Sequence, residues 1–229
     1  MQSHEGLSPD VVTFTCILKA CGKVGAINKG EQIHGEIVKK GFLEKDVVLG
    51  NALVDMYAKC GILVKAKQVL EDLPVRDIVS WNALIAGYVQ QGQGQEALNC
   101  LEHMQSEGLY PDSVTFICTL KACGIARAID KGRQIHDEIV RRHMLAKDVL
   151  LGTALINMYS KCGMLAKAQE VFDDLLVRNV VSWSSLIVGY AEEKKGREAL
   201  QCLEGMRNEG IFPDAVCLLC ILMTCSDIG

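Results

Sequence analysis

Apolar residues recur three or four positions apart along most of the chain, in short stretches that end at glycine, proline or polar residues. In residues 78–112, one such stripe runs from Val79 to Tyr88, and a second follows at 97–104. The polar and glycine-rich run 90–94 separates them. Spacing of this kind is typical of one face of an α-helix, and the interruption is typical of a turn. The segment therefore predicts two antiparallel helices of about three turns each.

The whole pattern is repeated. Residues 11–112 reappear at most positions as residues 113–214, an offset of 102 residues. Each copy divides into three helix pairs of 36, 31 and 35 residues. One pair is too small to bury both of its apolar stripes, so neighbouring pairs must stack. We expect an all-α fold, a right-handed superhelical solenoid of antiparallel helix pairs. The predicted repeats are 11–46, 47–77, 78–112, 113–148, 149–179 and 180–214, with partial repeats at 1–10 and 215–229.

Composition changes this picture little. The apolar content of 49% in 229 residues is enough for a buried core. The sequence contains no run of about 18 apolar residues, so it predicts no membrane-spanning helix. The net charge of −4 is less expected, because nucleic-acid-binding surfaces are usually basic. Charge taken alone favours a protein partner.

Eleven cysteines raise the question of disulfide or metal chemistry. Ten of them recur at equivalent positions of the copies, as Cys16 and Cys118 do. Cysteine that recurs once per repeat inside a helical pattern favours a small buried apolar residue with a reduced thiol. Cys217 and Cys220 have CxxC spacing, but without a second pair nearby they form only a weak metal or redox motif.

Two short segments imitate a zinc site. His34-Gly-Glu36 and His136-Asp-Glu138 match the H-x-E of zinc-dependent nucleobase deaminases, in which the histidine binds the metal. The Pro-Cys-x-x-Cys that completes such a site is absent from the sequence. Both segments fall in predicted second helices, so we interpret the histidines as structural residues at helix–helix interfaces. No nucleophile–base pair, phosphate-binding loop or carboxylate dyad stands out, and we predict no enzyme, catalytic residue, metal site or cofactor.

The residues of the third helix pair carry a family resemblance. Residues 79–88 read Val-Ser-Trp-Asn-Ala-Leu-Ile-Ala-Gly-Tyr, and Glu-Gly and Pro-Asp follow at 107–108 and 111–112. This pattern resembles a pentatricopeptide repeat. The three lengths resemble the plant subclass with long, short and standard repeats: residues 30–34 look like the long motif and residues 51–61 like the short one. The resemblance covers essentially the whole chain. The tetratricopeptide repeat has a similar period but a different Trp, Leu-Gly and Tyr pattern.

The resemblance implies sequence-specific binding of single-stranded RNA, one base per repeat. In the family, the fifth residue of a repeat bonds the base edge, the last residue supports it, and the second packs against the base face. The standard repeats then present Asn82 with Asp112 and Ser184 with Asp214, and the short repeats present Asn51 with Asp77 and Thr153 with Asn179. The long repeats, which follow the rule poorly, present Thr15 with Asp46 and Ile117 with Asp148. The second residues are Val12, Val48, Val79, Val114, Leu150 and Val181.

The family's pairing rule gives a hypothetical footprint. Asn with Asp implies U, Ser with Asp implies G, and Thr with Asn implies A. The long repeats stay unassigned, because Ile117 has no hydrogen-bonding side chain and Thr15 only weakly favours G. The footprint is N-U-U-N-A-G from 5′ to 3′. Asn51 changes to Thr153 between the copies while the surrounding scaffold is retained, as a base-reading array requires. Drift at solvent-exposed positions is the alternative explanation.

The resemblance also implies a mitochondrial or chloroplast protein that selects sites for RNA processing or cytidine-to-uridine editing, with editing-complex proteins as further partners and no membrane. The residues ahead of the first repeat are not Arg-rich and Ser-rich, so we expect no transit peptide in this segment. The chain begins inside a second helix and ends after the first helix of a third long repeat. We therefore expect a fragment that lacks the family's C-terminal extension and deaminase-like domain. A protein-binding helical scaffold and an inactive truncated fragment remain open as other functions.

Overall fold

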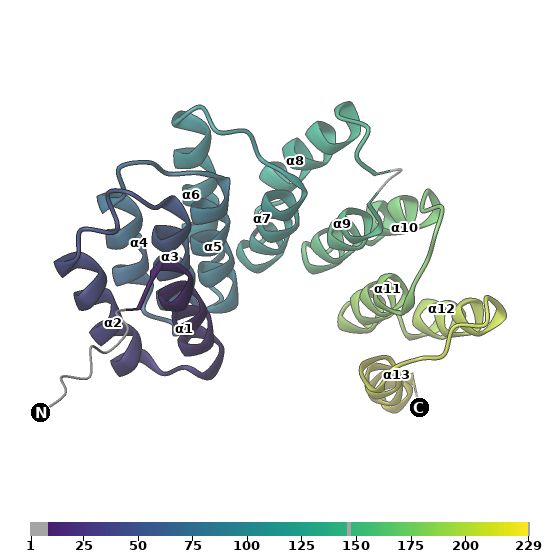
Figure 1. Ribbon diagram of the computed structural model, residues 1–229. Coiled ribbons are helices and arrows are strands. Elements are labelled where there is room, and N and C mark those ends of the chain that lie inside the picture. Colours follow the sequence, from purple (N-terminus) through teal and green to yellow (C-terminus); the bar gives the residue numbers. More distant parts are fainter. Residues whose placement is uncertain (1–8, 146–147, 229) are drawn as a thin grey trace, which may run out of the picture. The chain divides into compact units, whose positions relative to one another are not determined.

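The computed structural model describes residues 9–145 and 148–228, and within those residues it holds helices and no strand. Helices and turns alternate throughout, so the predicted all-α fold of helix pairs is confirmed (Figure 1). The partial repeat predicted at residues 1–10 falls mostly outside the described residues. The first helices of the pairs are α1 (Val11–Val24), α3 (Val47–Lys59), α5 (Ile78–Gln90), α7 (Ser113–Ala126), α9 (Val149–Lys161), α11 (Val180–Glu192) and α13 (Ala215–Ile228). The second helices are α2 (Ile27–Lys39), α4 (Leu63–Asp72), α6 (Gly94–Ser106), α8 (Ile129–Arg141), α10 (Leu165–Asp173) and α12 (Gly196–Asn208).

Each first helix starts directly after an aspartate or asparagine that caps it. The side chain of Asp77 accepts a hydrogen bond from the backbone N–H of Ser80 at 2.9 Å, and Asn179 does the same for Ser182. The first turn of a helix has backbone N–H groups without helical partners, and Asp and Asn are among the side chains that satisfy them best. The first helices consequently begin at the first residue of each predicted repeat.

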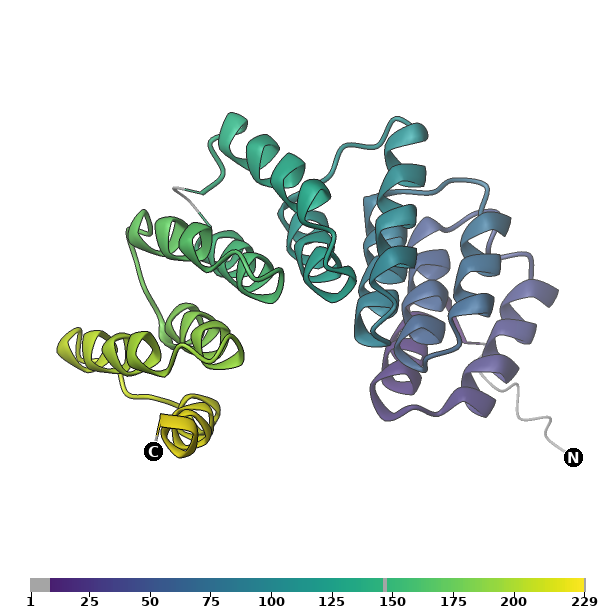
Figure 2. The ribbon, with the colours of Figure 1, turned by 180° about the vertical axis from the view of Figure 1, so that it is seen from behind.

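The chain forms two compact units, residues 1–92 with 99–111 and residues 93–98 with 112–229. In the first unit, α1, α3 and α5 pack side by side, and α2 and α4 cover them from one side (Figures 1 and 2). In the second unit, α7, α9, α11 and α13 form the corresponding layer, covered by α8, α10 and α12. Within each unit, consecutive first helices therefore make most of the contacts between repeats, and second helices also contact the first helix of the next repeat.

The cores of the two units repeat the same side chains. Phe14 and Tyr57 are fully buried in the first unit, as Phe116 and Tyr159 are in the second. Burial of each such ring stabilises the fold by roughly 2–3 kcal/mol. Consecutive first helices also approach closely: a Cβ added at Gly87 on α5 would lie 2.7 Å from the Cβ of Ala58 on α3. Only glycine fits at this crossing.

The histidines of the two H-x-E segments are structural, as predicted. The Nδ1 atom of His34 on α2 lies 2.9 Å from the hydroxyl of Tyr57 on α3, and His136 makes the same contact with Tyr159. Burial lowers the pKa of both imidazoles below the ordinary value, so the neutral form is favoured. Each histidine joins the second helix of a long repeat to the first helix of the next repeat.

The cysteine prediction is right in part. The ten described cysteines are free thiols, and Cys225 lies outside the residues whose side chains are described. Cys123 is buried, which raises the pKa of its thiol to about 12. Cys16, however, is exposed, so the interpretation as a buried apolar residue is wrong there. Its helix α1 is the first of its layer, and no earlier described helix packs against that face.

In the described part of the chain, no helix has the length and apolar content needed to cross a membrane.

Candidate functional site

The second residue of every complete repeat is an exposed apolar side chain on the first turn of a first helix. Exposed fractions lie between 54% and 68% for these six positions. Each compact unit carries three of them. Solvent-exposed apolar side chains at one position of consecutive repeats indicate a surface that contacts a ligand or partner. The six residues are Val12, Val48, Val79, Val114, Leu150 and Val181.

The fifth residues lie one turn further along the same helices, and most of them are covered. Thr15, Asn51, Thr153 and Ser184 are each less than a tenth exposed, whereas Asn82 and Ile117 are half-buried. The first four side chains therefore expose little of their own surface. The next first helix packs against each of the helices that carry them. Burial also argues against drift at solvent-exposed positions as the origin of their variation.

One predicted pair is joined directly. The amide nitrogen of Asn51 on α3 donates to both carboxylate oxygens of Asp77, at 3.1 and 3.0 Å. A carboxylate only accepts hydrogen bonds, so the nitrogen of the amide must face it and the oxygen must point away. That oxygen, Oδ1, is buried without a hydrogen-bond partner. The pair thus holds a fixed, unsatisfied acceptor at the boundary between two repeats.

A second pair is joined more loosely. The hydroxyl of Ser184 lies 3.4 Å from a carboxylate oxygen of Asp214 and donates over 2.6 Å to the carbonyl of Val180 in its own helix. The sulfur of Cys217 lies 3.0 Å from the same hydroxyl. The hydrogen bond from the backbone N–H of Cys217 is the main reason that the pKa of Asp214 lies below its ordinary value. This carboxylate is exposed and keeps its negative charge at neutral pH.

Two other pairs are not brought together. Thr153 donates its hydroxyl to the carbonyl of Val149 at 2.9 Å, and no hydrogen bond joins it to Asn179 within the described part of the chain. Thr15 likewise donates to Val11 at 2.8 Å, and the structure as described holds no hydrogen bond between Thr15 and Asp46. Short hydroxyl side chains in a helix commonly bond the carbonyl four residues earlier.

The remaining two predicted pairs are Ile117 with Asp148 and Asn82 with Asp112. Ile117 has no polar atom in its side chain with which to bond Asp148, whose carboxylate caps α9. Asn82 belongs to the first compact unit and Asp112 to the second. Asn82 is half-buried on α5, and Asp112 caps α7 through the N–H of Thr115 at 2.8 Å.

The last residues have a second role that was not predicted. In addition to its contact with Asn51, Asp77 caps α5, so one carboxylate joins the fifth residue of its repeat to the first helix of the next. The signal was present in the sequence, because Asp or Asn directly before an apolar helical pattern marks a helix start. Three residues after these caps, Ser80 and Ser182 bond the backbone carbonyls of Asp77 and Asn179.

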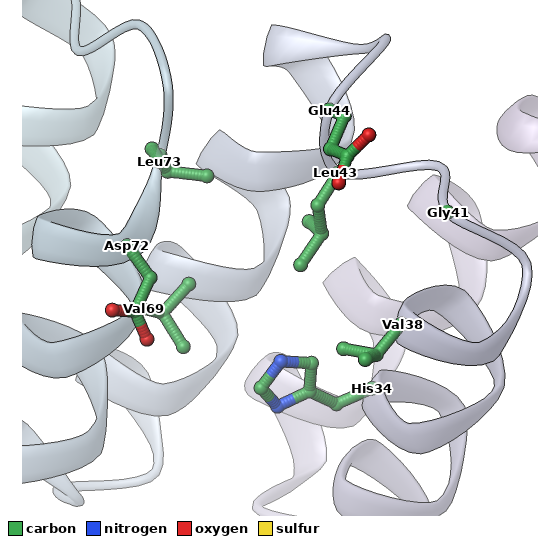
Figure 3. A pocket seen from close by; sticks show the side chains of 8 residues that line it. All are labelled: His34, Val38, Gly41, Leu43, Glu44, Val69, Asp72 and Leu73. Carbon is green, nitrogen blue, oxygen red and sulfur yellow. The ribbon is translucent and has the colours of Figure 1, made fainter.

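Two cavities recur at equivalent places, away from these residues. The first has a volume of about 280 Å³ and lies between α2, α4 and the segment that joins α2 to α3 (Figure 3). Its polar side chains are those of His34, Glu44 and Asp72, and its apolar lining includes Val38 and Val69. A cavity of about 240 Å³ occupies the same place in the second copy. None of the predicted base-contacting residues lines either cavity. Among the described residues, no group of His, Cys, Asp and Glu side chains could hold a metal ion.

Comparison with protein families gives matches along most of the chain. The family model described as "PPR repeat family" matches residues 76–124 and 178–226. The model described as "PPR repeat" matches residues 12–42, 51–78 and 153–180.

Similar proteins are found in Arabidopsis thaliana. A pentatricopeptide repeat-containing protein named as chloroplastic is 42% identical over 217 residues, which span 95% of this chain and 35% of that protein. One named as mitochondrial is 41% identical over 219 residues, again 95% of this chain and 35% of the relative. Among solved structures, the pentatricopeptide repeat protein PPR10 in complex with an 18-nt psaJ RNA element has a TM-score of 0.80 at 21% identity, over 94% of this chain and 33% of that one. The chain spans about a third of the length of these relatives.

Proposed function

Because the chain belongs to the pentatricopeptide repeat family, we propose that it binds single-stranded RNA through its repeat array and reads one base per repeat. Two observations on known proteins support RNA as the ligand. Proteins of this family read RNA with two or three side chains per repeat, and PPR10, which shares the fold, is solved in complex with an RNA element. The three repeat lengths further support membership of the long, short and standard subclass.

The observation that carries the proposal is the unsatisfied acceptor on Asn51. A buried acceptor without a partner destabilises a protein by about 1–3 kcal/mol, and a base that displaces the groups covering this oxygen and supplies a donor recovers part of that free energy. Uracil offers such a donor at N3–H. Asp77 holds the Asn51 amide in one orientation, so little side-chain entropy is lost when a base binds. The exposed Val48, one turn earlier on α3, would then contact the face of the base.

The other pairs offer different hydrogen-bonding groups. Asn179 uses its oxygen to cap α11, which leaves its amide N–H groups as donors that match the ring-nitrogen acceptors of adenine. Asp214 presents an exposed carboxylate, which matches the N1–H and N2–H donors of guanine. These matches support the footprint N-U-U-N-A-G, in which the long repeats leave two bases unspecified.

The names of the similar proteins support an organelle as the cellular location of this activity. Similar proteins are named as chloroplastic or mitochondrial. We therefore propose that the array selects sites on an organellar transcript for RNA processing or cytidine-to-uridine editing, together with editing-complex proteins. The array supplies recognition in this proposal, and no residue of the described chain is assigned a catalytic role.

The test is a binding competition at fixed salt concentration, since ionic strength alters every RNA affinity. A labelled RNA that contains N-U-U-N-A-G should bind more tightly than an RNA of the same composition in scrambled order. Equal affinity for both, or no binding, would contradict base reading. The net charge of −4 would then favour the alternative, a scaffold for protein partners.

A variant sharpens the test at one base. Asn51→Ser removes the amide but keeps Asp77, so the second base should change in preference from U towards G. The expected change is about tenfold, which corresponds to about 1.4 kcal/mol for one base contact. Asn28→Ser, at an exposed position on α2, is the matched control and should leave the preference unchanged.

A further inference from the structure

The third residue of a repeat lies close to the last residue of the preceding repeat, and in one case also to its fifth residue. Ser80, Ser182 and Cys217 occupy this position in three repeats, and all three are completely buried. Each donates its backbone N–H to the last residue of the preceding repeat, at 2.9 Å in every case. Their side chains, however, make different contacts.

The serines bond the backbone of the capping residue. The hydroxyl of Ser80 donates to the carbonyl of Asp77 at 2.8 Å and accepts from its N–H at 3.1 Å. Ser182 makes the same two contacts with Asn179, at 2.9 and 3.0 Å. These hydroxyls are occupied by backbone groups, so they leave the fifth residue of the preceding repeat untouched.

Cysteine contacts the fifth residue instead. The sulfur of Cys217 lies 3.0 Å from the hydroxyl oxygen of Ser184. That hydroxyl already donates its proton to Val180 at 2.6 Å, so the thiol is the group that donates to the oxygen. One lone pair of Ser184 is thereby occupied, and the exposed carboxylate of Asp214 is left as the main acceptor of the pair.

We propose that the third residue of a repeat positions the base-reading pair of the preceding repeat, and that Cys217 sets the selectivity of Ser184 and Asp214 for guanine over adenine. This inference rests on the proposed function. The amino group of adenine needs an acceptor, and a Ser184 oxygen with both lone pairs free is a better one than an oxygen that already accepts from the thiol. A serine at 217 would turn its hydroxyl to the backbone of Asp214, as Ser80 does at Asp77, and would release that oxygen.

The experiment compares wild type, Cys217→Ser and the control Cys220→Ser, which lies one turn further along α13. Affinities are measured for two RNAs that end in N-U-U-N-A-G and N-U-U-N-A-A. Cys217→Ser should lower the preference for the final G about fivefold by strengthening the A complex, as one added hydrogen bond would. Cys220→Ser should leave the ratio unchanged. An unchanged ratio in Cys217→Ser, with a wild type that prefers G, would overturn the inference and leave the proposed function standing.

A measurement without RNA separates the two proposals. In a crystal structure of Cys217→Ser, the new hydroxyl should bond the backbone N–H and carbonyl of Asp214, as Ser80 does at Asp77, and should no longer contact the Ser184 oxygen. Cys220→Ser should keep the Cys217 contact with Ser184. A serine at 217 that still contacts the Ser184 hydroxyl would refute the positioning contact even if the chain bound no RNA.

Discussion

The two short repeats, residues 47–77 and 149–179, share a scaffold but differ in the pairs of fifth and last residues for which we propose base reading, their proposed reading pairs. Both place a tyrosine, Tyr57 or Tyr159, in the core with the same histidine contact. In the first repeat, Asn51 is bonded to Asp77 across the boundary to the next repeat. In the second, Thr153 bonds its own helix, and Asn179 only caps the helix that follows. The same backbone thus supports a reading pair that is coupled to the next repeat and one that is not.

A long amide at the fifth position reaches the last residue of its repeat, whereas a short hydroxyl finds an acceptor four residues back in its own helix. We therefore expect the side chain at a fifth position, where we propose base reading, to affect how strongly consecutive repeats are joined.

The largest expected effect tests this coupling. Asp77→Ala removes a helix cap, which stabilises by about 1 kcal/mol, and leaves the Asn51 amide without its partner, at about 1–3 kcal/mol. The free energy of unfolding should fall by roughly 2–4 kcal/mol. Asn179→Ala removes only a cap and should lower it by about 1 kcal/mol. Urea unfolding followed by circular dichroism measures both.

The control for this prediction is Asp77→Asn. Asparagine caps a helix about as well as aspartate and still offers an oxygen to the Asn51 amide, so most of the stability should return. Equal losses for the two alanine variants would show that the Asn51 contact adds nothing beyond the cap.

A smaller effect on the free energy of unfolding is expected at Ser160, a buried polar residue of the second copy. Ser160 is buried on α9, and its hydroxyl has no hydrogen-bond partner. A Cβ added at Gly189 would lie 2.6 Å from that hydroxyl, so the hydroxyl faces a close helix crossing and not solvent. Ser160→Ala should therefore raise the free energy of unfolding by about 1–2 kcal/mol. The first copy has Ala58 at this position, and Ala58→Ser should lower it by a similar amount. If Ser160→Ala destabilised the protein, a partner for the hydroxyl would have to exist.

The helix pairs were predictable because their signals are local. Apolar spacing marks the helices, and the aspartate or asparagine before each first helix marks its start, so Asp77 and Asn179 define boundaries in the sequence itself. The exposed second residues, such as Val48, follow from the same register. A helical period of 3.6 residues then fixes which side chains point to the next repeat.

The hydrogen bonds of the site were not predictable in the same way. The sequence does not state that Asn51 reaches Asp77 whereas Thr153 turns to Val149, because that choice depends on side-chain length and on the packing of the next helix. The role of Cys217 depends on a three-dimensional contact with Ser184, 33 residues earlier. Such contacts follow from stacking, which the repeat pattern requires but does not describe in atomic detail.

The smallest expected effect is on the pH dependence of stability, and it tests whether His34 and His136, which are retained between the copies, behave alike. Burial is the main reason that the pKa values of His34 and His136 lie below that of a histidine in the unfolded chain, about 6.5. A depressed histidine pKa favours the folded state above pH 6.5, and this contribution is lost as the pH falls through the lower, folded-state value. The melting temperature should therefore fall as the pH is lowered from 6.5.

His34→Gln and His136→Gln should each remove about half of that pH dependence, because both imidazoles have the same tyrosine partner at 2.9 Å and burial as the main cause of their shift. Nearby charges differ in detail: Lys65 opposes protonation of His34, and Lys167 does so for His136. His103→Gln, at an exposed position on α6, is the control and should leave the slope as it is. Unequal effects of the two variants would mean that the copies differ in their scaffold as well as in their reading pairs, and the comparison of the short repeats would no longer isolate the latter.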